Sequence, residues 1–94
     1  MIPILLCGGS QGRAVVFGLV AAEPIPGTAV TLYEARMVLR WGGTAGLFGL
    51  AAVGPAPGSR LTCSVAQVTD CDWKQWMAVT PVAAEAMAAW PAAE

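Results

Sequence analysis

Alternation between hydrophobic and polar positions predicts a series of short β-strands along most of the chain. The segments with this pattern are enriched in Val, Leu, Thr and aromatic residues, which favour strands. They comprise residues 2–7, 13–20, 28–33, 34–41, 60–70 (with a possible bend) and 72–80. Proline- and glycine-rich stretches interrupt the pattern, most clearly AAEPIPG at 21–27 and PAPGS at 55–59, and these are expected to be loops.

The segment EARMVLRW at 34–41 fits two kinds of element. As a helix it would place Arg36 and Arg40 one turn apart. As a strand it puts Arg36, Val38 and Arg40 on one face and the three residues between and after them on the other. The clean alternation and the GG that follows favour the strand, and both interpretations place the two arginines side by side.

Two helices are expected among these strands. The first covers residues 44–54, with Thr44 as a fair N-cap and a glycine that stops it before Pro55. The second begins with Thr80 as N-cap and Pro81 at the first helical position, and it ends at Pro91. This C-terminal helix should pack on the sheet along one of two faces, either Val82, Ala86 and Ala89 or Met87 and Trp90.

These elements together predict an α+β fold that is mostly β. We expect a small antiparallel sheet or a partly open barrel, with one short internal helix and a C-terminal helix. Residues 1–94 are expected to form a single domain.

Composition adds an expectation of assembly. Hydrophobic residues make up 56% of the 94 residues and charged residues only 12%. A chain of this size buries about 60–65% of its unfolded surface, so it has more apolar material than its own core can hide. A membrane span is not expected, because glycine, proline and charge break the apolar runs well before about 20 residues. The start lacks a basic leader, so the chain is expected to stay inside the cell that makes it.

The glycine-rich stretch GGSQG at 8–12 raises the question of a phosphate site. A phosphate-binding loop needs a lysine followed by Ser or Thr at the opening of a helix. Here Arg13 follows instead, and the next residues, AVVFG, are poor helix formers. The stretch is therefore expected to be a hairpin connection, although its amides and Arg13 together offer a weak anion contact.

Catalytic and metal-binding patterns are missing from the sequence. There is no histidine, the six carboxylates form no motif, and the three cysteines (Cys7, Cys63 and Cys71) show no C-x-x-C spacing. We therefore expect no enzyme, no metal and no cofactor. The cysteines are expected to be small buried hydrophobes, with an inter-subunit disulfide as the alternative. Five basic residues and a net charge of −1 exclude strong nucleic-acid binding.

Arginine and tryptophan are the residue types here that suggest binding, since both are enriched at interaction hot spots. The chain has four tryptophans, and the pair Trp73 and Trp76 should lie on opposite faces of a strand. The candidate ligand- or partner-binding residues are Arg36, Arg40, Trp41, Arg13 and Trp76.

Several stretches resemble a family of short, functionally uncharacterised proteins encoded by tailed phages and prophages. They are FGLV at 17, VTLYEAR at 30, RWGG at 40, LFGLAAVG at 47 and VTPVAAEAM at 79. The resemblance covers about residues 3–88, with Arg36 and Trp41 as its best-matching positions. It implies a phage origin and supplies no function.

Two functions follow from these observations. The first is a non-enzymatic virion component, such as a capsid decoration or cement protein. It would be made in the host cytoplasm and would bind other copies of itself and other phage structural proteins. The second is a counter-defence protein that sequesters a small nucleotide signal as an oligomer, with Arg36 and Arg40 on the phosphates and Trp41 stacked on the base.

Overall fold

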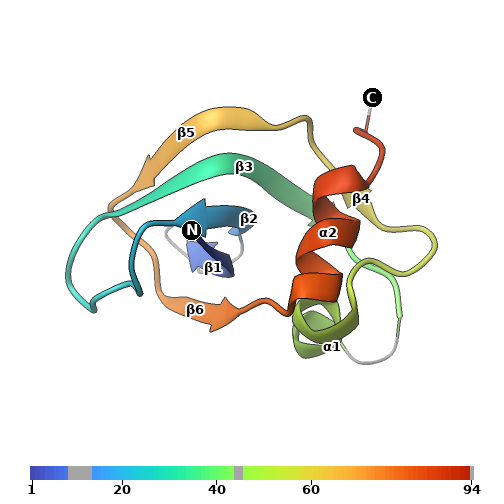
Figure 1. Cartoon of the computed structure of the whole chain (residues 1–94), viewed down its shortest axis with the longest axis horizontal. Coiled ribbons are helices and arrows are strands. Elements are labelled where there is room, and N and C mark those ends of the chain that lie inside the picture. The colour runs from blue at the N-terminus through green and yellow to red at the C-terminus, as the bar shows by residue number, and fades with distance from the viewer. Residues whose placement is uncertain (9–13, 44–45, 94) are drawn as a thin grey trace.

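The fold is a curled antiparallel sheet with two helices against one face (Figure 1). The computed structural model describes residues 1–8, 14–43 and 46–93. The elements are β1 (Ile2–Gly8), β2 (Ala14–Val20), β3 (Val30–Arg40), α1 (Gly46–Val53), β4 (Arg60–Leu61), β5 (Val65–Asp70), β6 (Gln75–Ala78) and α2 (Pro81–Ala89). The predicted α+β class, mostly β with one internal and one C-terminal helix, is confirmed.

The sheet order is β4-β3-β2-β1-β6, and β5 pairs with the first half of β3. β1 and β2 pair from Ile2 opposite Val20 to Gly8 opposite Ala14. They are adjacent antiparallel strands, so the expected hairpin is confirmed. The connecting residues 9–13, including Arg13, lie outside the described residues.

The sheet must curl because its two edges are joined by a short linker. β5 and β6 lie on opposite sides of the β1–β2 hairpin, and residues 71–74 connect them around one end of the sheet (Figure 1). Four strand spacings in a flat sheet would separate the two edges by about 19 Å. The linker, even when fully extended, spans at most about 17 Å. The sheet is therefore curled but open, since β5 pairs with β3 and β6 pairs with β1, and the two edge strands do not pair with each other.

Curling gives the protein two apolar clusters, one on each face of the sheet. Inside the curl lie Ile4, Leu6, Val20, Val30, Leu32 and Ala35. The outer cluster joins strand residues to both helices and includes Leu5, Phe17, Val38, Leu50, Ala83 and Met87. β1 is buried from Ile4 onward because both of its faces are covered.

β3 is one continuous strand, whereas the sequence predicted two strands meeting at residues 33 and 34. Glu34 stands at the expected break with φ of 51°, and the register to β2 shifts between Phe17 and Leu19. This is a β-bulge: it bends the strand without ending it. Ala35 therefore faces the inside of the curl and Arg36 faces the helices.

Gly18 lies beside this bulge, on the neighbouring strand. A Cβ at this position would lie 2.9 Å from both Cβ and Cδ2 of Leu32. The missing side chain leaves the space that Leu32 fills in the inner cluster.

The remaining strands are shorter than predicted. The possible bend in 60–70 separates β4 from β5, and the strand expected over 72–80 covers only Gln75–Ala78. Trp73 therefore precedes β6, so the alternation of strand faces does not apply to it. The expectation that Trp73 and Trp76 lie on opposite faces is wrong, because both pack against the inner cluster.

The end of α1 and the start of α2 lie where the sequence predicts them. Gly54 follows α1 with φ of 92°, and its N–H donates to the Leu50 carbonyl. Thr80 caps α2, since the Ala83 N–H donates to Thr80 Oγ1 over 3.1 Å. Thr44, the expected N-cap of the first helix, lies outside the described residues.

α2 packs along the second of the two predicted faces. Met87 is fully buried and Trp90 packs against the same cluster, whereas Val82 is 69% exposed. Within the described ranges, neither helix is long and apolar enough to cross a membrane.

Candidate functional site

Arg36 joins β3 to the end of α2. Its Nε donates to the Thr62 carbonyl over 2.7 Å, and its Nη1 donates to the Met87 carbonyl over 2.6 Å. A longer contact of 3.5 Å reaches the Ala88 carbonyl. The last carbonyls of a helix lack partners within the helix and carry its negative dipole end, so a guanidinium is a well-matched cap there. The residue is only 4% exposed.

A cavity of about 380 Å³ lies beside this cap, and we call it the α2 cavity. Its walls come from β2, β3, residue 64 and α2. The lining residues are Phe17, Leu19, Glu34, Arg36, Ser64, Ala84, Glu85 and Ala88. One of these lining residues, Glu34, has a strained backbone: among the described residues other than glycine, it is the one with a positive φ.

The charges around the α2 cavity disfavour phosphate. Glu34 and Glu85 line it. The ion pair found in the described part of the chain joins Lys74 to Asp72, so it involves neither of these glutamates. Two carboxylates repel an anionic ligand, while the guanidinium already donates to carbonyls. Apolar walls with two acceptors at the rim suit a small group that has an apolar body and a positive end.

The other predicted residues do not join Arg36 in one pocket. Arg40 is exposed at the end of β3, in register with Arg60 of β4, and Trp41 packs against the outer cluster. Neither residue lines the α2 cavity. The expectation that Arg36 and Arg40 lie side by side is wrong, because residues four apart on an extended strand are about 13 Å apart.

Trp76 lies on the opposite face of the sheet from Arg36. It is half-buried against the inner cluster, opposite Leu6 of β1. The set of Arg36, Arg40, Trp41 and Trp76 is therefore spread over both faces of the sheet.

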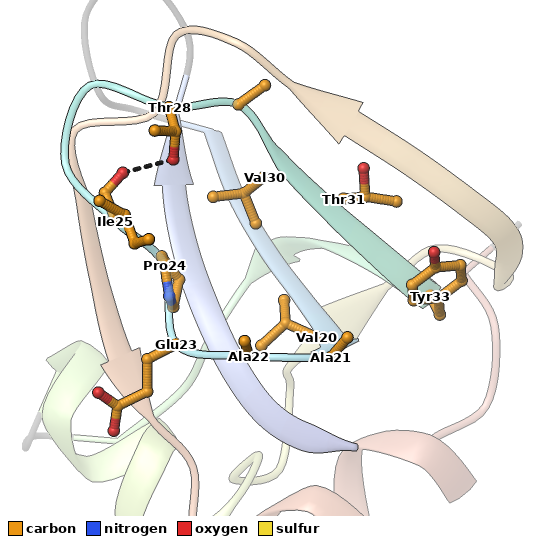
Figure 2. A pocket seen from close by; sticks show the side chains of 11 residues that line it. Val20, Ala21, Ala22, Glu23, Pro24, Ile25, Thr28, Val30, Thr31 and Tyr33 are labelled. Atoms are coloured by element: carbon orange, nitrogen blue, oxygen red, sulfur yellow. Dashed lines mark hydrogen bonds between the residues drawn. The ribbon is translucent and has the colours of Figure 1, made fainter.

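Figure 2 shows a second hollow, under the loop between β2 and β3. It has a volume of about 250 Å³, and residues from Val20 to Tyr33 line it. Thr28 Oγ1 donates to the Ile25 carbonyl over 2.7 Å, which closes the loop. The carboxylate of Glu23 points away from the other labelled side chains (Figure 2). Polar groups therefore do not converge in this hollow.

A third hollow is almost entirely apolar and lies between β3 and the start of β5. We call it the β3–β5 groove. Its volume is about 250 Å³, and it is lined by Val16, Ala35, Met37, Thr62, Cys63, Val65 and Val68. Met37 is 43% exposed and Val65 is 50% exposed, so the groove opens to solvent. It suits an apolar surface of another molecule.

The cysteines differ in their surroundings. Cys7 is buried, as expected, and burial raises the pKa of its thiol. Cys63 and Cys71 are exposed, so the expectation of burial is wrong for these two. All three are free thiols, and within the described ranges no three metal-ligating side chains come together.

Comparison with known families gives one match. The model of the family described as Domain of unknown function (DUF6948) matches residues 2–90, from the start of β1 to Trp90, the residue directly after α2. The chain belongs to this family. No curated protein and no solved structure matches the chain. The family description names no activity.

Sequence reasoning identified Arg36 and missed its neighbours in the α2 cavity. Glu34, Ser64 and Glu85 come from three separate segments and form no motif. Their proximity depends on the bulge in β3 and on the way α2 crosses the sheet. The positive φ of Glu34 has no signature in the sequence, since glycine or asparagine is the usual residue in that conformation.

Proposed function

We propose that this protein is a non-catalytic assembly subunit that acts through protein–protein interfaces. In its specific form it is a virion component of a tailed phage, such as a capsid decoration or cement protein. The phage origin rests on the resemblance in sequence. The assembly role rests on the surface.

The observation that carries the proposal is the amount of apolar side chain left on the surface. The accessible surface is 5431 Å², close to the roughly 5,100 Å² expected for a monomer of this mass. The fold therefore buries an ordinary share of its surface. The exposed large hydrophobic side chains of the described residues are Met1, Ile2, Ile25, Met37, Leu39, Phe48, Val53, Val65 and Val82. Phe48 is 72% exposed, and the β3–β5 groove is open. An open groove with almost entirely apolar walls is a candidate interaction site.

The ionisable groups buried in the structure support binding over catalysis. Arg36 donates to backbone carbonyls, so its guanidinium serves the fold. The raised pKa of Cys7 disfavours the thiolate that a nucleophile needs.

The alternative function, sequestration of a nucleotide by Arg36, Arg40 and Trp41, gains no support from where these residues lie. It requires guanidinium groups free to bind phosphate next to a stacking ring. Arg36 is instead a helix cap in a cavity lined by two carboxylates, and Trp41 belongs to the outer cluster.

The test is mass spectrometry of purified virions from a phage that encodes this chain. The protein should be present at a fixed copy number relative to the major capsid protein. If it occurs in infected cells and is missing from virions, the virion role is refuted. Light scattering and hydrophobic-dye binding test the broader assembly role. A monomer at high concentration that binds no dye would overturn it.

A further inference from the structure

β5 is a strand with one unused edge. Among the described residues it pairs with β3 alone, and it runs along the outer rim of the sheet (Figure 1). The rim strand next to it, β4, is covered, because Leu61 bridges to Ala92 and its carbonyl accepts from the Ala93 N–H. β5 therefore presents free N–H and C=O groups to solvent, and another strand can pair with such an edge.

The chemistry of β5 offers little to prevent this pairing, since its one charge, Asp70, is at its end. Natural edge strands are protected by lysine, proline or short length. β6, the other open edge, has four residues and follows Lys74. β5 has six residues, and the stretch from Thr62 to Thr69 carries no charge and no proline. Of the two edges, β5 is the one suited to receive a partner strand.

We propose that two copies of this chain pair through their β5 edges, antiparallel, about a two-fold axis at Gln67. This inference rests on the proposed assembly role and names the partner as a second copy. Self-pairing about an axis perpendicular to the sheet sets each residue opposite a residue on the same face. The side chains from Val65 to Thr69 are uncharged and meet without like-charge repulsion, and Asp70 at the end of β5 lies opposite the uncharged Ser64 of the other copy. The β3–β5 groove lies beside the new strand pair, so Met37 and Val65 gain cover.

The two exposed cysteines favour Gln67 as the centre. Cys63 and Cys71 each lie four residues from it, on opposite sides. β5 alone separates its ends by about 17 Å, so the two thiols cannot pair within one chain. Across the proposed axis, Cys63 lies opposite the partner's Cys71. Cys63 lies two residues before β5 and Cys71 directly follows it. Directly opposed residues in antiparallel strands have Cα atoms about 4.5–5.5 Å apart, so continuing the pairing beyond both ends of β5 brings the two thiols within the range that a disulfide spans.

The first experiment measures association by sedimentation or light scattering over a concentration series. The parent chain should show a monomer–dimer equilibrium. Gln67→Lys places two like charges opposite each other and should raise the dimer dissociation constant about two- to fivefold. Gln75→Lys on β6 is the matched control, because it makes the same change on the other open edge. It should leave dimerisation unchanged, and thermal melts check that both variants fold.

The second experiment uses oxidised glutathione as the oxidant. Two thiols lose two protons and two electrons to form the disulfide, and the oxidant becomes two molecules of reduced glutathione. The parent chain should form a covalent dimer. Cys63→Ser alone and Cys71→Ser alone should not, because each homodimer lacks one member of every pair. A mixture of the two variants should form one cross-link, between Cys63 of one chain and Cys71 of the other.

The outcomes separate this interface from the general assembly role. Cross-linking by either single variant alone would overturn the register at Gln67. A parent dimer that is equally sensitive to Gln67→Lys and Gln75→Lys, or to neither, would overturn the β5 interface while assembly stands. A strictly monomeric protein that is nonetheless found on virions would overturn self-pairing and leave the virion role intact.

Discussion

Replacing Arg36 with alanine should destabilise the fold substantially. The change removes the donors to the Thr62 and Met87 carbonyls, which are 2.7 and 2.6 Å from the guanidinium nitrogens. It also removes the positive charge at the C-terminal end of α2. The truncated side chain leaves these carbonyls without their donors beneath the helix.

The magnitude follows from these contacts. A hydrogen bond from a charged donor contributes about 1.5–3 kcal/mol, and a cation at a helix C-terminus about 0.3–1 kcal/mol. Relief of the burial cost of the guanidinium offsets part of the sum. We expect a net loss of about 3 kcal/mol in the free energy of unfolding. For a domain of this size that corresponds to a fall in Tm of about 12–24 °C.

Chemical denaturation and calorimetric melts measure this loss, with two comparison variants. Arg36→Lys keeps the charge but not the forked donor, so it should lose about 1.5 kcal/mol. Arg40→Ala removes an exposed arginine from the same strand and should change stability by less than about 0.5 kcal/mol. If Arg36→Ala left Tm within about 3 °C of the parent, the capping role would be refuted. Micromolar nucleotide binding that disappears in the same variant would favour sequestration instead.

Three further changes test other parts of the fold. Thr80→Ala removes the N-cap of α2 and the 2.7 Å bond from Oγ1 to the Ala52 carbonyl, so denaturant melts should show a loss of about 1–2 kcal/mol; an unchanged midpoint would contradict the cap. Gly18→Ala should cost about 1–3 kcal/mol by overpacking against Leu32, and a second change, Leu32→Val, should recover part of it if that contact is the cause. The folded protein should show two reactive thiols in alkylation followed by mass spectrometry, with Cys7 protected until denaturant is added. The raised pKa of Cys7 also means that the unfolded chain loses this proton first, so the stability contributed by this thiol is lost as pH rises into the alkaline range.

Local signals in the sequence were sufficient for most of the elements. Alternation and β-forming residues located β1 and β2, and Thr80 with Pro81 located the start of α2. Gly54 located the end of α1. These features act within a few residues of chain, through side-chain periodicity, caps and backbone conformation. They can be recognised without knowing what packs against them.

The tertiary structure decided how those elements combine, and that determined the site. The bulge at Glu34 depends on pairing with β2 and β5, and it turned an expected break into a continuous strand. The same geometry directed Arg36 toward the end of α2, where helix carbonyls supplied partners that no local pattern encodes. The curl of the sheet placed Trp73 and Trp76 in one cluster and left the edge of β5 open. Each of these outcomes depends on contacts between residues far apart in the chain, so periodicity, which is a property of neighbours, could not specify them.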